Sequence, residues 1–131
     1  MPLPKIIQSA PLQLQIYTSL AIAISGAFDS EPKPVSTYEA LCSGRFYRHD
    51  LAIVVKTAKG EVVAFCLAWL DEQNRVGLLE PVGCHPDYQR LGLASAAVNA
   101  ALEALRVAGA QTAVVYPAGD DSNDYDWTIA L

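Results

Sequence analysis

The order strand, long helix, strand over residues 76–116 restricts the fold of this chain more than any other feature. The apolar runs 76–84 and 112–116 each predict a buried strand. Between them, apolar residues recur at helical spacing over about 90–108, and Gly109 follows where a helix C-cap belongs. A helix of this length joins two parallel strands through a right-handed crossover. The segment therefore predicts an α/β domain with a partly parallel sheet.

The N-terminal half adds helices and antiparallel strands to this unit. Residues 12–27 carry apolar side chains every four positions, which predicts an amphipathic helix. Residues 36–39 have the S-x-x-E form of a capping box, which predicts a short second helix. The apolar runs 51–55 and 62–70 predict a hairpin. Pro81 cannot donate a ladder hydrogen bond, so it predicts a bulge or a point where its strand leaves a neighbour.

Composition favours one folded domain over the 131 residues, with a core at 12–116 and an acidic tail at 117–131. Hydrophobic residues make up 52% of the chain and charged residues 18%, which is typical of a globular protein. The formal net charge is −5 and no Lys/Arg-rich run occurs, so nucleic acid is not an expected partner. No apolar run reaches the roughly 20 residues of a membrane span, so no membrane partner is expected either.

The cysteines indicate a reducing compartment. Cys42, Cys66 and Cys84 are odd in number, far apart and in no CxxC pair, so we expect three reduced thiols and a cytoplasmic protein. The apolar stretch 16–28 is similar to a weak signal peptide, but polar residues interrupt it. Adjacent strand residues face opposite sides, so Cys84 and His85 are not expected to form a thiol–imidazole pair.

The junction at residues 89–94 has the form Q-x-x-G-x-A and suits a diphosphate. Gly92 allows a ligand to approach the backbone because it has no Cβ. The free N–H groups and the dipole of the helix N-terminus attract anions, and Arg90 adds a positive side chain. The alternative is a tight connection that needs small residues for packing only, and the spacing alone does not decide between them.

Residues 76–94 resemble the acetyl-CoA motif of the GNAT superfamily of N-acetyltransferases, whose general form is R/Q-x-x-G-x-G/A after a strand and a proline-containing turn. Residues 64–71 and the helix that ends at Gly109 also fit the order of elements in that family. The resemblance implies a mixed α/β (α+β) sheet with helices on both faces. It implies transfer of an acetyl group from acetyl-CoA to an amine of a small molecule or a protein, without a metal. The alternative is a non-catalytic acyl-CoA-binding or interaction module with a degenerate acceptor site.

The resemblance also implies residue roles. The pantetheine arm would bind the backbone of Val82, Gly83 and Cys84. The pyrophosphate would bind the N–H groups of Arg90, Leu91, Gly92, Leu93, Ala94 and Ser95. Glu80 is the candidate general base because it lies on the same strand, and it shares a face with Val82 and Cys84 unless a bulge at Pro81 changes the alternation. Alternatively, Glu80 pairs with Arg75 or caps a loop.

Both ends of the chain depart from the family pattern. Only a short stretch with two prolines precedes the helix at residue 12, and no Gly-Phe pair or closing strands follow residue 117. The fold is therefore expected to be incomplete at the first strand and at the C-terminal strands, as in a truncated member or one whose sheet a homodimer completes. Tyr125 is the candidate general acid because it lies in the region where the family has such a tyrosine, although its spacing differs. Tyr116 is expected to be a core aromatic residue instead.

Overall fold

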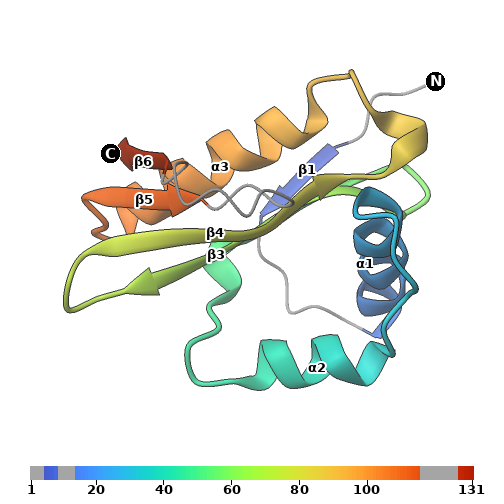
Figure 1. Cartoon of the computed structure of the whole chain (residues 1–131), viewed down its shortest axis with the longest axis horizontal. Coiled ribbons are helices and arrows are strands. Elements are labelled where there is room, and N and C mark those ends of the chain that lie inside the picture. Colours follow the sequence, from blue (N-terminus) through green and yellow to red (C-terminus); the bar gives the residue numbers. More distant parts are fainter. Residues whose placement is uncertain (1–4, 9–13, 116–126) are drawn as a thin grey trace.

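A six-stranded mixed sheet forms the centre of the protein (Figure 1). The computed structural model describes residues 5–8, 14–115 and 127–131. The strands are β1 (Lys5–Gln8), β2 (Ala52–Lys56), β3 (Val62–Asp71), β4 (Val76–Cys84), β5 (Thr112–Val115) and β6 (Trp127–Ala130). They lie side by side in chain order, and β4 and β5 are the parallel pair in an otherwise antiparallel sheet.

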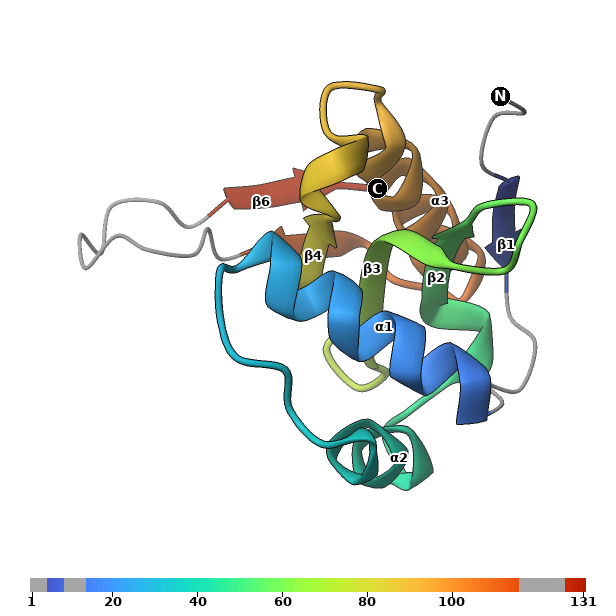
Figure 2. The same ribbon diagram turned by 90° about the vertical axis from the view of Figure 1, so that its right-hand side faces the viewer.

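Helices cover both faces of this sheet (Figures 1 and 2). One face carries α1 (Leu14–Ala27) and α2 (Val35–Ser43), and the other carries α3 (Leu93–Val107). Two short 3-10 turns, His49–Leu51 and Pro86–Tyr88, precede β2 and α3. This arrangement confirms the predicted fold class. None of the described helices is long and apolar enough to cross a bilayer.

Each face of the sheet has its own apolar core. On the first face, Leu20 and Ala23 of α1 pack with Phe65 of β3. On the other face, α3 buries Ala97, Ala101 and Leu105 against the sheet. The two alanines allow α3 to approach the sheet closely, because each adds only a methyl group to the contact. This close packing fixes the position of α3 on the sheet and therefore the position of its N-terminus.

A bulge interrupts β4 where Pro81 predicted one. Val82 pairs with Cys66 and Leu79 pairs with Ala68, so Glu80 and Pro81 together oppose Leu67 alone. In the described part of the chain, β5 pairs with β4 only as far as Leu79. The second half of β4 therefore keeps β3 on one side and leaves its other edge without a described strand partner.

Two expectations about the ends of the chain were wrong. A first strand is present, because β1 pairs with β2 over four residues. Four residues beside prolines carry too weak a pattern to predict a strand from the sequence. A closing strand is also present, because β6 pairs antiparallel with β5, so 127–130 is not part of an acidic tail. Residues 117–126 of the predicted tail lie outside the described residues, as do Tyr116 and Tyr125.

Candidate functional site

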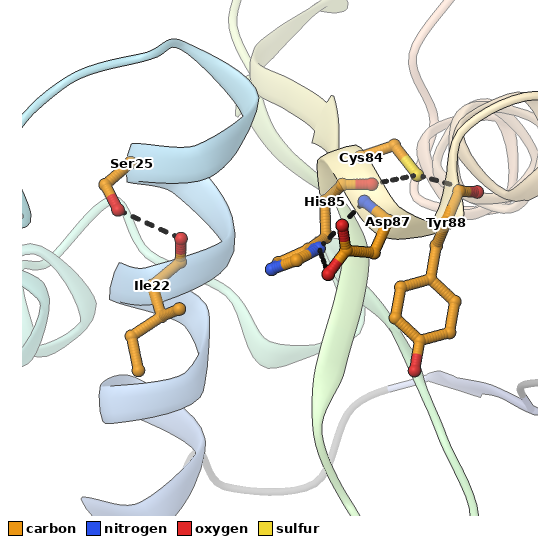
Figure 3. Close-up of polar contacts among 6 residues, drawn as sticks. All are labelled: Ile22, Ser25, Cys84, His85, Asp87 and Tyr88. Carbon is orange, nitrogen blue, oxygen red and sulfur yellow. Dashed lines mark hydrogen bonds and ion pairs between the residues drawn. The ribbon is translucent and has the colours of Figure 1, made fainter.

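The connection from β4 to α3 is built from local hydrogen bonds (Figure 3). His85 caps the turn Pro86–Tyr88, because its Nδ1 accepts a hydrogen bond from the N–H of Asp87 at 3.1 Å. The Cys84 thiol donates to the Tyr88 carbonyl at 3.4 Å. The thiol and the imidazole therefore have separate partners, as the strand alternation predicted.

Left-handed residues bring the chain into α3. Arg90 has φ +62° and Gly92 has φ +76°, and the helix begins at Leu93 rather than near Arg90 as predicted. The first backbone bond of the helix runs from the Ala96 N–H to the Gly92 carbonyl at 3.0 Å. The N–H groups of Leu93, Ala94 and Ser95 therefore have no acceptor within the helix. They are available to an anion.

A cavity of about 250 Å³ lies at this helix N-terminus. It brings together most of the residues predicted to bind pyrophosphate, with Cys84 and Tyr88 at its edge. The predicted residues that line it are Cys84, Arg90, Gly92, Leu93, Ala94 and Ser95. Leu91 does not line it and is 59% exposed. No ion pair of the described residues involves Arg90, so its charge is available to a ligand.

A second cavity, of about 950 Å³, lies around Glu80 between the α1 side of the sheet and the edge of β4, where Leu79, Val82 and Val115 also line it. Its walls are largely apolar and include Ile24, Phe28, Tyr38 and Leu41. Its charged lining residues are Glu31, Lys33 and Glu80. No ion pair of the described residues joins Glu80 to Arg75, so the pairing considered as an alternative role does not occur.

The bulge changes which residues share a face. Val82 and Cys84 pack against the core under α3, as Leu79 does. Glu80 follows Leu79 directly and lies in the cavity on the α1 side. A Cβ at Gly83 would meet Phe65 Cζ at 2.8 Å and Ala27 Cβ at 2.9 Å, so this position also faces α1. The side chain of Glu80 therefore leaves β4 toward α1, whereas those of Val82 and Cys84 pack under α3, although Val82 also lines the Glu80 cavity.

Trp69 is a residue whose place in the site was missed in the sequence. Its indole Nε1 donates a hydrogen bond to the Glu80 carbonyl at 2.7 Å. Its ring also contacts the ring of Tyr47 edge-on, with centroids 6.2 Å apart. Sequence reasoning could not find this contact, because it joins two strands whose register the bulge shifts.

Burial changes the acidity of the thiols. Burial raises the pKa of Cys84 above its ordinary value, and it raises the pKa of Cys66 to about 12. Both side chains are therefore protonated at neutral pH. Within the part of the chain that the structure describes, no three His, Cys, Asp or Glu side chains lie close enough together to hold a metal ion.

Comparison with known proteins identifies the class. A model of the acetyltransferase (GNAT) family matches residues 16–125. The chain therefore belongs to the GNAT acetyltransferase family. No protein with a curated description matches the sequence.

The fold is also similar to that of several solved acetyltransferases. A GNAT family acetyltransferase from Brucella melitensis in complex with acetyl-CoA has a TM-score of 0.69 at 21% identity, covering 97% of this chain and 87% of that one. The ribosomal-protein-S18-alanine N-acetyltransferase from Escherichia coli has a TM-score of 0.67 at 20% identity, covering 90% and 70%. A GNAT family N-acetyltransferase from Escherichia coli in complex with CoA has a TM-score of 0.71 at 18% identity, covering 88% and 63%. At these identities the likeness shows the fold alone.

Proposed function

We propose that this chain is an acetyl-CoA-dependent N-acetyltransferase whose acceptor is an amine of a small molecule or a peptide. The observation that carries the proposal is the position of the two cavities. One lies at the N-terminus of α3 and the other around Glu80, and both border the part of β4 beyond Leu79. In the described residues, this part of β4 has no β5 partner. A cofactor held at α3 can reach Glu80 along this free edge.

The cofactor roles follow from the groups at this edge. The pyrophosphate binds the N–H groups of the first turn of α3, with Gly92 giving access and Arg90 adding a positive charge. The backbone groups of Val82, Gly83 and Cys84 bind the pantetheine arm as an added strand would. Leu91 does not line the cavity, so only its backbone N–H is proposed to contact the cofactor.

The Glu80 cavity is the proposed acceptor site. Two carboxylates, Glu31 and Glu80, favour a cationic amine, although Lys33 offsets part of their charge. Phe28 and Leu41 are large apolar side chains that remain 42% and 40% exposed at this cavity. An acceptor with an apolar body beside its amine would cover them. These features favour an apolar primary amine over a polar one.

Acetyl transfer in this site needs one proton acceptor and one proton donor. The amine nitrogen attacks the thioester carbonyl carbon, the C–S bond breaks, and the CoA thiolate leaves. Glu80 accepts the proton that the amine loses. The thiolate takes up a proton as it departs, and Tyr125 stays the proposed donor, although it lies outside the described residues.

Thermal unfolding with and without acetyl-CoA tests the cofactor site. A ligand at 100 times its Kd adds about 2.7 kcal/mol to the free energy of unfolding. We expect Gly92→Val to abolish this stabilisation. The valine side chain would occupy the open space through which the pyrophosphate is proposed to approach the backbone. Gly60→Val is the matched control, since Gly60 also has a positive φ, +86°, and open surroundings but lies in a turn between β2 and β3. Normal binding by Gly92→Val would show that the junction is only structural.

Release of free CoA with a panel of amines tests catalysis. We expect turnover with apolar primary amines, and a loss of about 10²–10⁴-fold in Glu80→Gln with unchanged acetyl-CoA binding. Unchanged turnover in Glu80→Gln would remove the base role. Acetyl-CoA binding without CoA release for any amine would favour the alternative, a non-catalytic acyl-CoA-binding module.

Two broader features also stay proposals. Pairing of a second copy along the outer edge of β6 would extend the sheet, so a homodimer is proposed, and sedimentation equilibrium would measure it. A cytoplasmic location is proposed from the three free cysteines.

A further inference from the structure

Trp69 makes a hydrogen bond that ordinary strand pairing does not explain. In the register of the sheet it pairs with Leu78, yet its indole reaches two residues further along β4 to the Glu80 carbonyl. Trp69 and Phe65 are four residues apart on β3 and share the face that α1 covers. Glu80 also lies on that face. The donor and the residue whose backbone it holds are therefore on the same side of the sheet.

The Glu80 backbone has little other support. Glu80 and Pro81 form the bulge opposite Leu67, and a bulge leaves its extra residue unpaired in the ladder. The pairing of β5 with β4 ends one residue earlier in the described chain. The indole N–H is the donor that the Glu80 carbonyl has at 2.7 Å, a short distance for an N–H to oxygen bond.

Ring contacts with neighbouring residues fix the position of the indole itself. Its ring contacts Tyr47, and Tyr47 in turn packs edge-on against His49 with centroids 5.1 Å apart. Both of these residues belong to the segment between α2 and β2. The three rings in contact connect that segment to the bulge, and these contacts restrict the position of the indole.

We propose that Trp69 is a positioning residue for Glu80. By holding the carbonyl of the bulge, the indole sets the orientation of the adjoining peptide and thereby the direction in which the Glu80 carboxylate leaves the strand. This inference rests on the proposed function, in which that carboxylate receives the proton of the acceptor amine. Trp69 itself touches neither substrate in this scheme.

A double-mutant cycle separates this role from a general structural one. Trp69→Phe keeps an aromatic ring and removes the N–H, and we expect kcat to fall at least tenfold with the KM for acetyl-CoA within twofold of wild type. In the Glu80→Gln background, the same substitution should change kcat less than twofold, because the group that it positions is already lost. Leu70→Val is the control, because it reduces the packing of the next residue of β3, which lies on the opposite face. Its kcat should stay within twofold of wild type.

Each result of the cycle has a separate meaning. If Trp69→Phe lowers kcat by the same factor in both backgrounds, Trp69 does not act through Glu80 and the inference is overturned, while the proposed function stands. If Glu80→Gln alone leaves turnover unchanged, the base role fails and the positioning role fails with it.

Hydrogen exchange gives a second measurement that needs no activity. We expect the amides of Val82 and Gly83 to exchange at least tenfold faster in Trp69→Phe, with the amides of β2 unchanged. Identical exchange at the bulge in both proteins would overturn the inference, whatever the turnover.

Discussion

Gly77→Ala tests how closely α3 is seated on the sheet. Gly77 is buried on β4, and a Cβ there would lie 2.8 Å from Leu105 Cδ2 and 3.1 Å from Leu105 Cγ, with Cδ1 nearer still. Leu105 is fully buried in the core under α3. The added methyl group therefore has no room unless Leu105 or the helix moves.

The expected cost follows from two opposing terms. Inserting a methyl group into a packed core costs about 1–3 kcal/mol. Replacing glycine reduces the entropy of the unfolded chain and returns about 0.4–1 kcal/mol. We expect Gly77→Ala to lower the free energy of unfolding by about 1–2 kcal/mol, measured by urea unfolding at 25 °C. With an m-value of about 1–3 kcal/mol/M, the midpoint falls by roughly 0.3–2 M.

Leu105→Ala supplies the matching arm of the experiment. Alone it leaves a cavity and costs about 2–5 kcal/mol. The Cβ of residue 77 would then enter that cavity, so the double variant should be more stable than the sum of the two losses by at least about 1 kcal/mol. Gly44→Ala is the control, because its Cβ meets only the Leu41 carbonyl at 3.4 Å and its φ is −67°. Additive losses, or a Gly77→Ala protein as stable as wild type, would refute this packing.

Three further predictions concern groups away from this contact. Burial raises the pKa of Cys66 to about 12, above its unfolded value of about 9. The stability that the protonated thiol gives the folded state is therefore complete below pH 9 and is lost as the pH rises toward 12. Between pH 8 and pH 10, wild type should lose about 1.4 kcal/mol more free energy of unfolding than Cys66→Ala, measured by urea unfolding; equal losses in the two proteins would contradict this. Acetyl-CoA should slow alkylation of Cys84, which lines the cavity at α3, as followed by peptide mass spectrometry; an unchanged rate would place the cofactor elsewhere. Ser19→Ala should cost about 1–2 kcal/mol in thermal or urea unfolding, because Ser19 Oγ accepts the Val62 N–H at 2.7 Å between α1 and β3; no loss would mean that water replaces the hydroxyl.

Periodic patterns predicted most of the fold. The strand Val76–Cys84 has the bounds that its apolar run predicted, and the helix predicted at 12–27 begins two residues later, at Leu14. The terminal strands β1 and β6 have four residues each, which is too short for periodicity to separate them from loop. Their existence depends on pairing with β2 and β5, and pairing between distant segments is not written in a local pattern.

The site was less accessible to sequence reasoning than the fold. The residues near α3 could be predicted because they are consecutive, and a helix N-terminus exposes its N–H groups whatever its surroundings. Even there, the helix begins at Leu93 and not near Arg90 as predicted. The left-handed backbone conformations of Arg90 and Gly92 belong to the folded loop and are not visible in the sequence pattern. The contact of Trp69 with the Glu80 carbonyl could not be predicted, because it needs the register of two strands and the position of a bulge.

The bulge has a consequence for catalysis that strand alternation alone would hide. In a regular strand that keeps Leu79 under α3, Glu80, Val82 and Cys84 would all face the α1 side. The two-for-one step at Glu80 and Pro81 instead returns Val82 and Cys84 to the α3 side and leaves Glu80 on the α1 side. The acceptor amine would then approach from the α1 side and the thioester of acetyl-CoA from the α3 side, and the two would meet at the edge of β4 that has no described strand partner. A substitution that restores regular pairing at residues 80–81 should therefore reverse the faces of Val82, Gly83 and Cys84 and weaken acetyl-CoA binding, measured as stabilisation in thermal unfolding. Unchanged stabilisation by acetyl-CoA in such a variant would show that the cofactor does not use the backbone of these three residues.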